Sequence, residues 1–109
     1  MTDLKSTTHY QRQRFLAYDR DHGQCVRCLA PAGSIHHRQG RGGPDPHRLS
    51  NLISVCGDGT TGCHAWIHAH PAESYANGWM VRRHGTDRTD KTPVRYGDLK
   101  VTLTYEWTP

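Results

Sequence analysis

All four cysteines and most of the histidines of this 109-residue chain fall within one stretch, residues 25 to 70. The chain offers little material for a hydrophobic core, because only 34% of its residues are hydrophobic and a single Phe is present. A domain of this size normally buries about two-thirds of its unfolded surface, and small domains with few apolar residues are often stabilised by a bound metal. We therefore expect one domain, residues 1–109, whose stability depends partly on a metal.

The cysteines form two pairs, Cys25-x-x-Cys28 and Cys56 with Cys63. Two residues between thiols let both sulfurs face one ion, so the first pair strongly indicates half of a zinc site. The second pair is a weaker indication because six residues separate it, although three glycines make the intervening loop flexible. We expect all four cysteines to bind a structural zinc. Two disulfides, or a redox pair at Cys25 and Cys28, remain alternatives.

The histidines suggest a second metal site of a different kind. His64 and His68 are four residues apart in a segment expected to be helical, so both rings project from one face. His36, on an expected strand, is the candidate third ligand. Three neutral imidazoles leave a divalent ion its full charge and open positions with which to stabilise a phosphate. The neighbouring His37 is expected to stay unliganded and to act as a general base.

Neighbouring residues on a strand point to opposite faces. His36 and His37 therefore act on one phosphate only if the substrate backbone lies against the strand from both sides.

The remaining pattern predicts an α+β fold. We expect a helix from Thr8 to about His22 ended by a glycine, and a second helix from about Cys63 that Pro71 ends or restarts. Strands are expected at residues 34–38, 51–55, 79–83, 94–96 and 100–107. A loop rich in Gly and Pro, residues 39–50, is expected between the first two strands. This divides the chain into an N-terminal tail and helix (1–24), a metal-binding core (25–78) and a β-rich extension (79–109).

Charge favours anionic partners, because 14 Lys and Arg residues outnumber 10 Asp and Glu residues and give a net charge of +4. A metal ion and a general base beside one phosphate would hydrolyse a phosphodiester bond. Three arginines near the histidines, Arg38, Arg41 and Arg48, are expected to hold the phosphates that flank this bond. No apolar run reaches the roughly 18 residues of a membrane span, and no secretory pattern follows Met1. We expect no membrane association and a cytoplasmic protein.

The order His-His, Gly-rich loop, Asn-Leu-Ile, Cys and Cys-His-x-x-x-His resembles the HNH endonuclease family and its ββα-metal core. The resemblance covers Cys25 to about His70. It implies that His36, His64 and His68 bind the catalytic ion, that His37 is the general base, and that Asn51 braces the loop orienting this base. The stretched spacing between Cys56 and Cys63 departs from the commoner zinc knuckle of such proteins.

The resemblance implies a metal-dependent endonuclease that hydrolyses DNA phosphodiester bonds with low sequence specificity and leaves 5′-phosphate and 3′-hydroxyl ends. It implies two cofactors: a structural zinc and one active-site ion, Mg²⁺, Mn²⁺, Ni²⁺, Co²⁺ or Zn²⁺. The compact form with a β-rich tail is similar to phage and prophage members. That similarity implies DNA packaging or processing in a bacterial or phage-infected cell, with a terminase-type partner, as a monomer or a dimer. The alternative is a non-catalytic zinc-knuckle module that binds nucleic acid.

Overall fold

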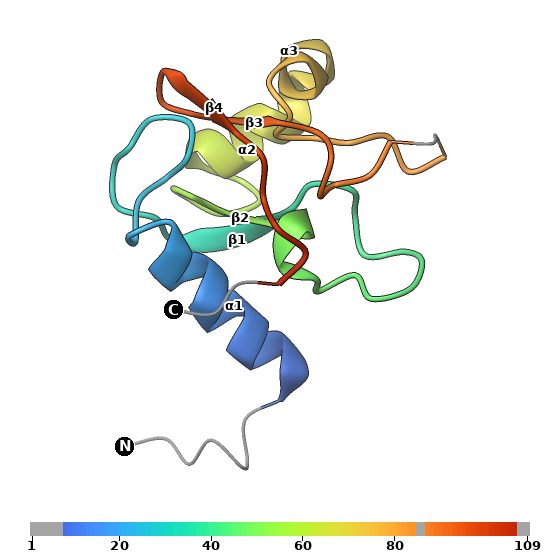
Figure 1. The fold of residues 1–109 in the computed structure, drawn as a ribbon. Helices are drawn as coiled ribbons and strands as arrows, with labels where there is room; N and C mark the ends of the chain where they lie inside the picture. Colours follow the sequence, from blue (N-terminus) through green and yellow to red (C-terminus); the bar gives the residue numbers. More distant parts are fainter. Residues whose placement is uncertain (1–7, 85–86, 107–109) are drawn as a thin grey trace, which may run out of the picture.

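The computed structural model describes residues 8–84 and 87–106. It is an α+β structure with two small antiparallel sheets of two strands each (Figure 1). In chain order the elements are α1 (His9–Arg20), β1 (Ser34–His37), the 3₁₀ turn η2 (Leu49–Asn51), β2 (Leu52–Val55), α2 (Gly62–Ala69), α3 (Pro71–Ala76), β3 (Val94–Tyr96) and β4 (Leu99–Val101).

The hairpin of β1 and β2 lies at the centre, between α1 on one face and α2 on the other (Figure 1). The strands pair antiparallel, from Ser34 opposite Val55 to His37 opposite Leu52. All four residues of β2 are buried, because alternate side chains serve opposite faces. Ile53 and Val55 pack with α2, whereas Leu52 packs with Ala17 of α1. The two faces of the β1–β2 hairpin are thus covered by different helices.

Helix α1 confirms the expected N-terminal helix and ends two residues before the expected His22. Thr8 caps it, and the side chains of Thr8 and Gln11 form a reciprocal capping box. Immediately after the helix, the buried Asp21 accepts hydrogen bonds from the Ser54 N–H (2.9 Å) and the Tyr96 hydroxyl (2.5 Å). This carboxylate ties the end of α1 to β2 and β3.

Pro71 separates α2 from α3, as expected from its place at the first turn of the new helix. Of the expected strands, the one at residues 79–83 is wrong and the one at residues 100–107 is shorter than expected. Residues 79–83 form no strand, because their backbone bonds to scattered partners: the Met80 N–H to the Ser74 carbonyl and the Val81 N–H to the Arg38 carbonyl. Of the expected strand 100–107, only the start is extended, in β4; Trp107 lies outside the described residues.

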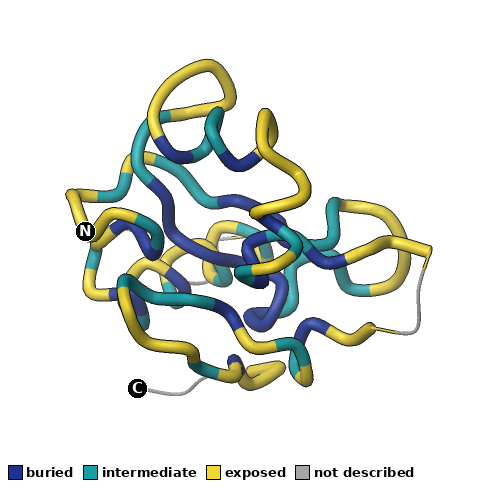
Figure 2. Tube along the Cα trace, turned by 90° about the horizontal axis from the view of Figure 1, so that it is seen from above, coloured by how far each residue is buried: buried dark blue, intermediate teal, exposed yellow. Residues whose placement is uncertain are grey.

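The larger core cluster joins the second and third expected segments of the chain, whereas α1 packs in a smaller cluster with Leu49 and Leu52. Val26, Ile53 and Ile67 from the metal-binding region pack with Trp79 and Val94 of the C-terminal extension. Figure 2 shows the buried segments gathered in the middle and the exposed ones in peripheral loops. Within the described part of the chain, no helix has the length and apolar character needed to cross a bilayer.

Candidate metal centres and active site

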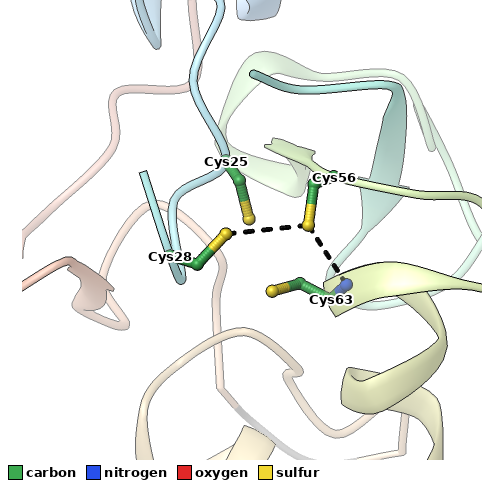
Figure 3. Close-up of side chains that lie close together, drawn as sticks. All are labelled: Cys25, Cys28, Cys56 and Cys63. Carbon is green, nitrogen blue, oxygen red and sulfur yellow. Dashed lines mark hydrogen bonds between the residues drawn. The ribbon is translucent and has the colours of Figure 1, made fainter. Parts of the chain in front are cut away.

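Cys25, Cys28, Cys56 and Cys63 form a cysteine cluster in which all four ligand atoms lie within 4.8 Å of one another. Their side chains converge from separate segments of the chain (Figure 3), and none is in a disulfide. The Cys28 and Cys56 sulfurs are 3.6 Å apart, close to the separation of about 3.8 Å that follows from Zn–S bonds of about 2.3 Å in a tetrahedron. The donor type and spacing fit a zinc ion, and the long loop between Cys56 and Cys63 does not prevent closure.

The surroundings disfavour four thiolates in the absence of a cation. Burial raises the pKa of the Cys63 thiol to about 12, whereas the Cys63 N–H, 3.3 Å from the Cys56 sulfur, lowers the pKa of Cys56. The Arg27 guanidinium donates to the Cys63 sulfur (3.3 Å) and lies 3.6 Å above the Trp66 ring centre. A metal that holds four thiolates would replace this partial compensation, so ion binding and folding should be coupled.

His36, His64 and His68 form a second group, the histidine centre, with ligand atoms that also lie within 4.8 Å of one another. The rings come from β1 and from one face of α2, with centroids 5.0 to 5.3 Å apart. His36 is only 2% exposed, whereas His68 is exposed. The centre is therefore anchored on one side and open to solvent on the other.

Hydrogen bonds determine which nitrogen of two rings can bind an ion. His36 Nε2 lies 2.9 Å from the Trp79 carbonyl oxygen, which only accepts, so Nε2 carries the proton and Nδ1 keeps its lone pair. His64 Nδ1 lies 2.8 Å from Ser34 Oγ, and that hydroxyl donates its own proton to the Gly57 carbonyl at 2.8 Å. His64 Nδ1 is thus protonated and Nε2 is free. Metal-binding histidines commonly have their second nitrogen fixed in this way.

Burial also keeps the His36 and His64 rings neutral. It lowers the pKa of His36 to about 3, with smaller contributions from His64 and His68. Burial, followed by the neighbouring His68, likewise lowers the pKa of His64. Because only the neutral imidazole has a lone pair for a cation, the histidine centre suits a divalent ion at physiological pH.

His37 belongs to the opposite side of β1, as its position next to His36 requires. Its Nε2 lies 3.0 Å from Nδ1 of His47, and the Tyr10 ring stacks on His47 with centroids 4.1 Å apart. Burial, and next the Arg41 charge, lower the pKa of His37 to about 4. His37 nevertheless shares a cavity of about 490 Å³ with His36 and His68.

Asn51 is completely buried and holds the loop that follows β1. Its Oδ1 accepts from the Gln39 N–H (2.7 Å), and its Nδ2 donates to the carbonyls of Gly40 (3.0 Å) and Pro46 (2.8 Å). These contacts span the loop that carries His47 to His37. Asn51 therefore braces this loop, and its part in orienting a general base stays a prediction.

The three arginines expected at the substrate differ from one another. Arg38 does not fit the expectation: it is 1% exposed and its guanidinium donates to four backbone carbonyls, those of Ser50, Gly78, Thr89 and Thr92. Its charge holds the C-terminal extension against the core. Arg48 is half-buried and bonds Thr89 and Gln39, whereas Arg41 is exposed and donates to the Tyr10 hydroxyl (3.2 Å).

Sequence reasoning missed several residues of the site. Arg82 and Arg83 are exposed and line the cavity beside the histidine centre; their adjacency in a basic pair was the available signal. The sequence also gives no reason to place His47 and Tyr10 beside His37. Contact between these two residues and His37 depends on how α1 packs, which spacing alone does not reveal.

The two groups adjoin in the chain, since Cys63 and His64 are consecutive residues of α2. Together they give one candidate site for a structural ion and one for an exchangeable ion. Comparison with protein-family models, curated proteins and solved structures found no match to this chain.

Proposed function

We propose that the chain is a metal-dependent endonuclease of the HNH type that hydrolyses DNA phosphodiester bonds. The observation that carries the proposal is a group of three metal-competent histidines, two of which, His36 and His68, line a solvent-open cavity together with the differently bonded His37. A nucleic-acid binding module has no need of such a set. Resemblance to phage and prophage members further suggests DNA packaging or processing beside a terminase-type protein.

His36 and His64 would hold the catalytic ion through the lone pairs that their hydrogen bonds leave free, and the exposed His68 would be the third ligand. A divalent ion bound there supplies Lewis-acid stabilisation of negative charge on the phosphate and on the departing oxygen. The cysteine cluster would hold a structural zinc and take no part in the reaction. This division follows from the donors, since four thiolates close a tetrahedron and three imidazoles do not.

His37 would accept the proton of the attacking water. If its Nε2–H donates to His47 Nδ1, then Nδ1 of His37 is the free, basic nitrogen. The same hydrogen bond then stabilises the imidazolium that forms. The low pKa of the free protein's His37, about 4, arises first from burial and next from Arg41. A bound phosphate would offset the cationic neighbours and raise that pKa.

The exposed arginines 41, 82 and 83 suit the substrate backbone, because guanidinium groups bind phosphate oxygens in two-point contacts. These contacts carry no base sequence. Because the contacts proposed here are to phosphates and not to base edges, we propose low sequence specificity.

The test is nicking of supercoiled plasmid with added Mg²⁺, Mn²⁺, Ni²⁺ or Co²⁺. We expect His37→Ala to lower the cleavage rate by about 10³-fold, the scale of a lost general base, while DNA binding in a gel-shift assay is retained. The control is His70→Ala, because His70 lies on Trp66 and bonds the Trp66 carbonyl, away from the cavity.

Equal cleavage by wild type and His37→Ala contradicts the catalytic assignment. Binding without cleavage by the wild type, with every metal, leaves the non-catalytic zinc-knuckle module.

A further inference from the structure

Ser34 is a half-buried hydroxyl at the start of β1 that makes two hydrogen bonds, both to residues close to the metal-binding groups. It accepts from His64 Nδ1 and donates to the Gly57 carbonyl, each at 2.8 Å. A hydroxyl has one proton to give, and the carbonyl takes it. Ser34 thereby acts as an acceptor toward His64 and imposes the tautomer that frees Nε2.

The carbonyl that orients Ser34 belongs to the loop of the cysteine cluster. Gly57 follows Cys56 and has φ +77°, and a Cβ there would lie 2.1 Å from the Thr61 carbonyl oxygen. This backbone position accommodates only glycine, so the direction of the Gly57 carbonyl is set by how the loop closes between Cys56 and Cys63. The His64 N–H is in turn bonded to the Cys56 carbonyl at 3.1 Å. The backbone of His64 thus bonds the cysteine loop directly, and its ring bonds the loop through Ser34.

We propose that Ser34 is a positioning residue that holds His64 for the ion of the histidine centre and links this centre to the cysteine cluster through Gly57. The proposal rests on ion binding by the histidine centre, a part of the proposed function, and does not require catalysis. Closure of the cysteine loop on its own ion fixes the Gly57 carbonyl, then the Ser34 hydroxyl, then the His64 ring. The affinity of the open centre would therefore depend on an intact cysteine loop.

The experiment measures Ni²⁺ binding to the zinc-loaded full chain by titration calorimetry, with zinc content determined before and after. We expect Ser34→Ala to weaken Ni²⁺ binding by about 10- to 100-fold, the usual effect of removing the partner of a metal-binding histidine. Ser34→Thr keeps the hydroxyl and should restore most of the affinity. Long-range ¹H–¹⁵N NMR without Ni²⁺ should show the Nδ1–H tautomer of His64 in the wild type and its loss in Ser34→Ala.

The matched control is Ser54→Ala in the same hairpin. Ser54 is buried, and its hydroxyl has no hydrogen-bond partner among the described residues, so its removal should leave Ni²⁺ affinity unchanged. Unchanged affinity in Ser34→Ala, or an equal loss in Ser54→Ala, overturns the role of Ser34 while the ion site stands. Absence of Ni²⁺ binding in the wild type overturns this proposal together with the catalytic one.

Discussion

The cysteine cluster and the histidine centre use neighbouring residues of the same helix for opposite purposes. Cys63 is buried and its cluster gathers four ligands, enough to close a tetrahedral shell. His64 follows directly, yet its group supplies three ligands and includes the exposed His68. An ion in the cysteine cluster would have no position left for a further ligand. An ion in the histidine centre would keep at least one position open.

The difference is consistent with a small-core chain that fixes an exposed group of ligands by means of a closed one. The cysteine cluster connects the turn after α1 with the end of β2, which pairs with the strand of His36, and with the start of α2, which carries His64 and His68. An ion bound there would supply stability that the few apolar residues do not. The open centre can then expose a ligand to solvent without depending on its own ion for folding.

The largest effect should come from breaking the closed cluster. Cys25→Ser removes a fully buried ligand, and structural zinc contributes on the order of 10 kcal/mol to small domains that depend on it. We expect loss of zinc and of the cooperative thermal unfolding transition seen by circular dichroism. His68→Ala, its counterpart in the open centre, should change the free energy of unfolding by less than about 1 kcal/mol, because the side chain is exposed.

A folded, zinc-free Cys25→Ser protein, or a His68→Ala protein that does not fold, would reverse the roles assigned to the two groups.

The same contrast between buried and open groups applies to the arginines. Arg38→Met leaves four backbone carbonyls, three of them in buried hydrogen bonds, without their donor, so we expect a loss of roughly 3 kcal/mol in the free energy of unfolding. Arg83→Met, in the cavity wall, should cost less than about 0.5 kcal/mol but should weaken DNA binding and reduce its salt dependence. Chemical denaturation and salt-dependent gel shifts measure the two effects. Equal destabilisation by both substitutions would show that Arg38 does not hold the C-terminal extension against the core.

Local features of the fold were predictable from the sequence because short-range chemistry determines them. The Thr8 capping box, the break at Pro71 and the grouping of the four cysteines each depend on spacing or on one residue type. The family resemblance added the residue order around His36 and His37. Its roles for these residues stay proposals, although the placement of the side chains is compatible with them.

Long-range packing explains what the sequence did not predict. Arg38 looks like a surface charge in a polar segment, and only the return of the C-terminal extension over β1 buries it. Residues 79–83 have the composition of a strand. However, the Trp79 side chain packs in the core, and the backbone of this segment pairs with none of the described strands. His47 reaches His37 because Asn51 folds the intervening loop.

The smallest predicted effect is a pH dependence that belongs to the histidine centre. Burial lowers the pKa of His36 to about 3, so the unfolded chain, with a pKa near 6.5, binds the proton first as the pH falls. The stability contributed by the neutral ring is complete above pH 6.5. Below that it decreases by at most about 1.4 kcal/mol per pH unit, until the folded pKa is reached.

We expect this loss when urea unfolding of the zinc-loaded protein, with no second metal added, is compared between pH 7 and pH 5. The reference is His36→Gln, whose amide can still donate to the Trp79 carbonyl but does not titrate. Acid release of zinc from the cysteines affects both proteins equally, so the difference between them isolates His36. Identical pH dependence in the two proteins would mean that His36 is not buried as a neutral ring, and the contrast between the two centres would lose its electrostatic basis.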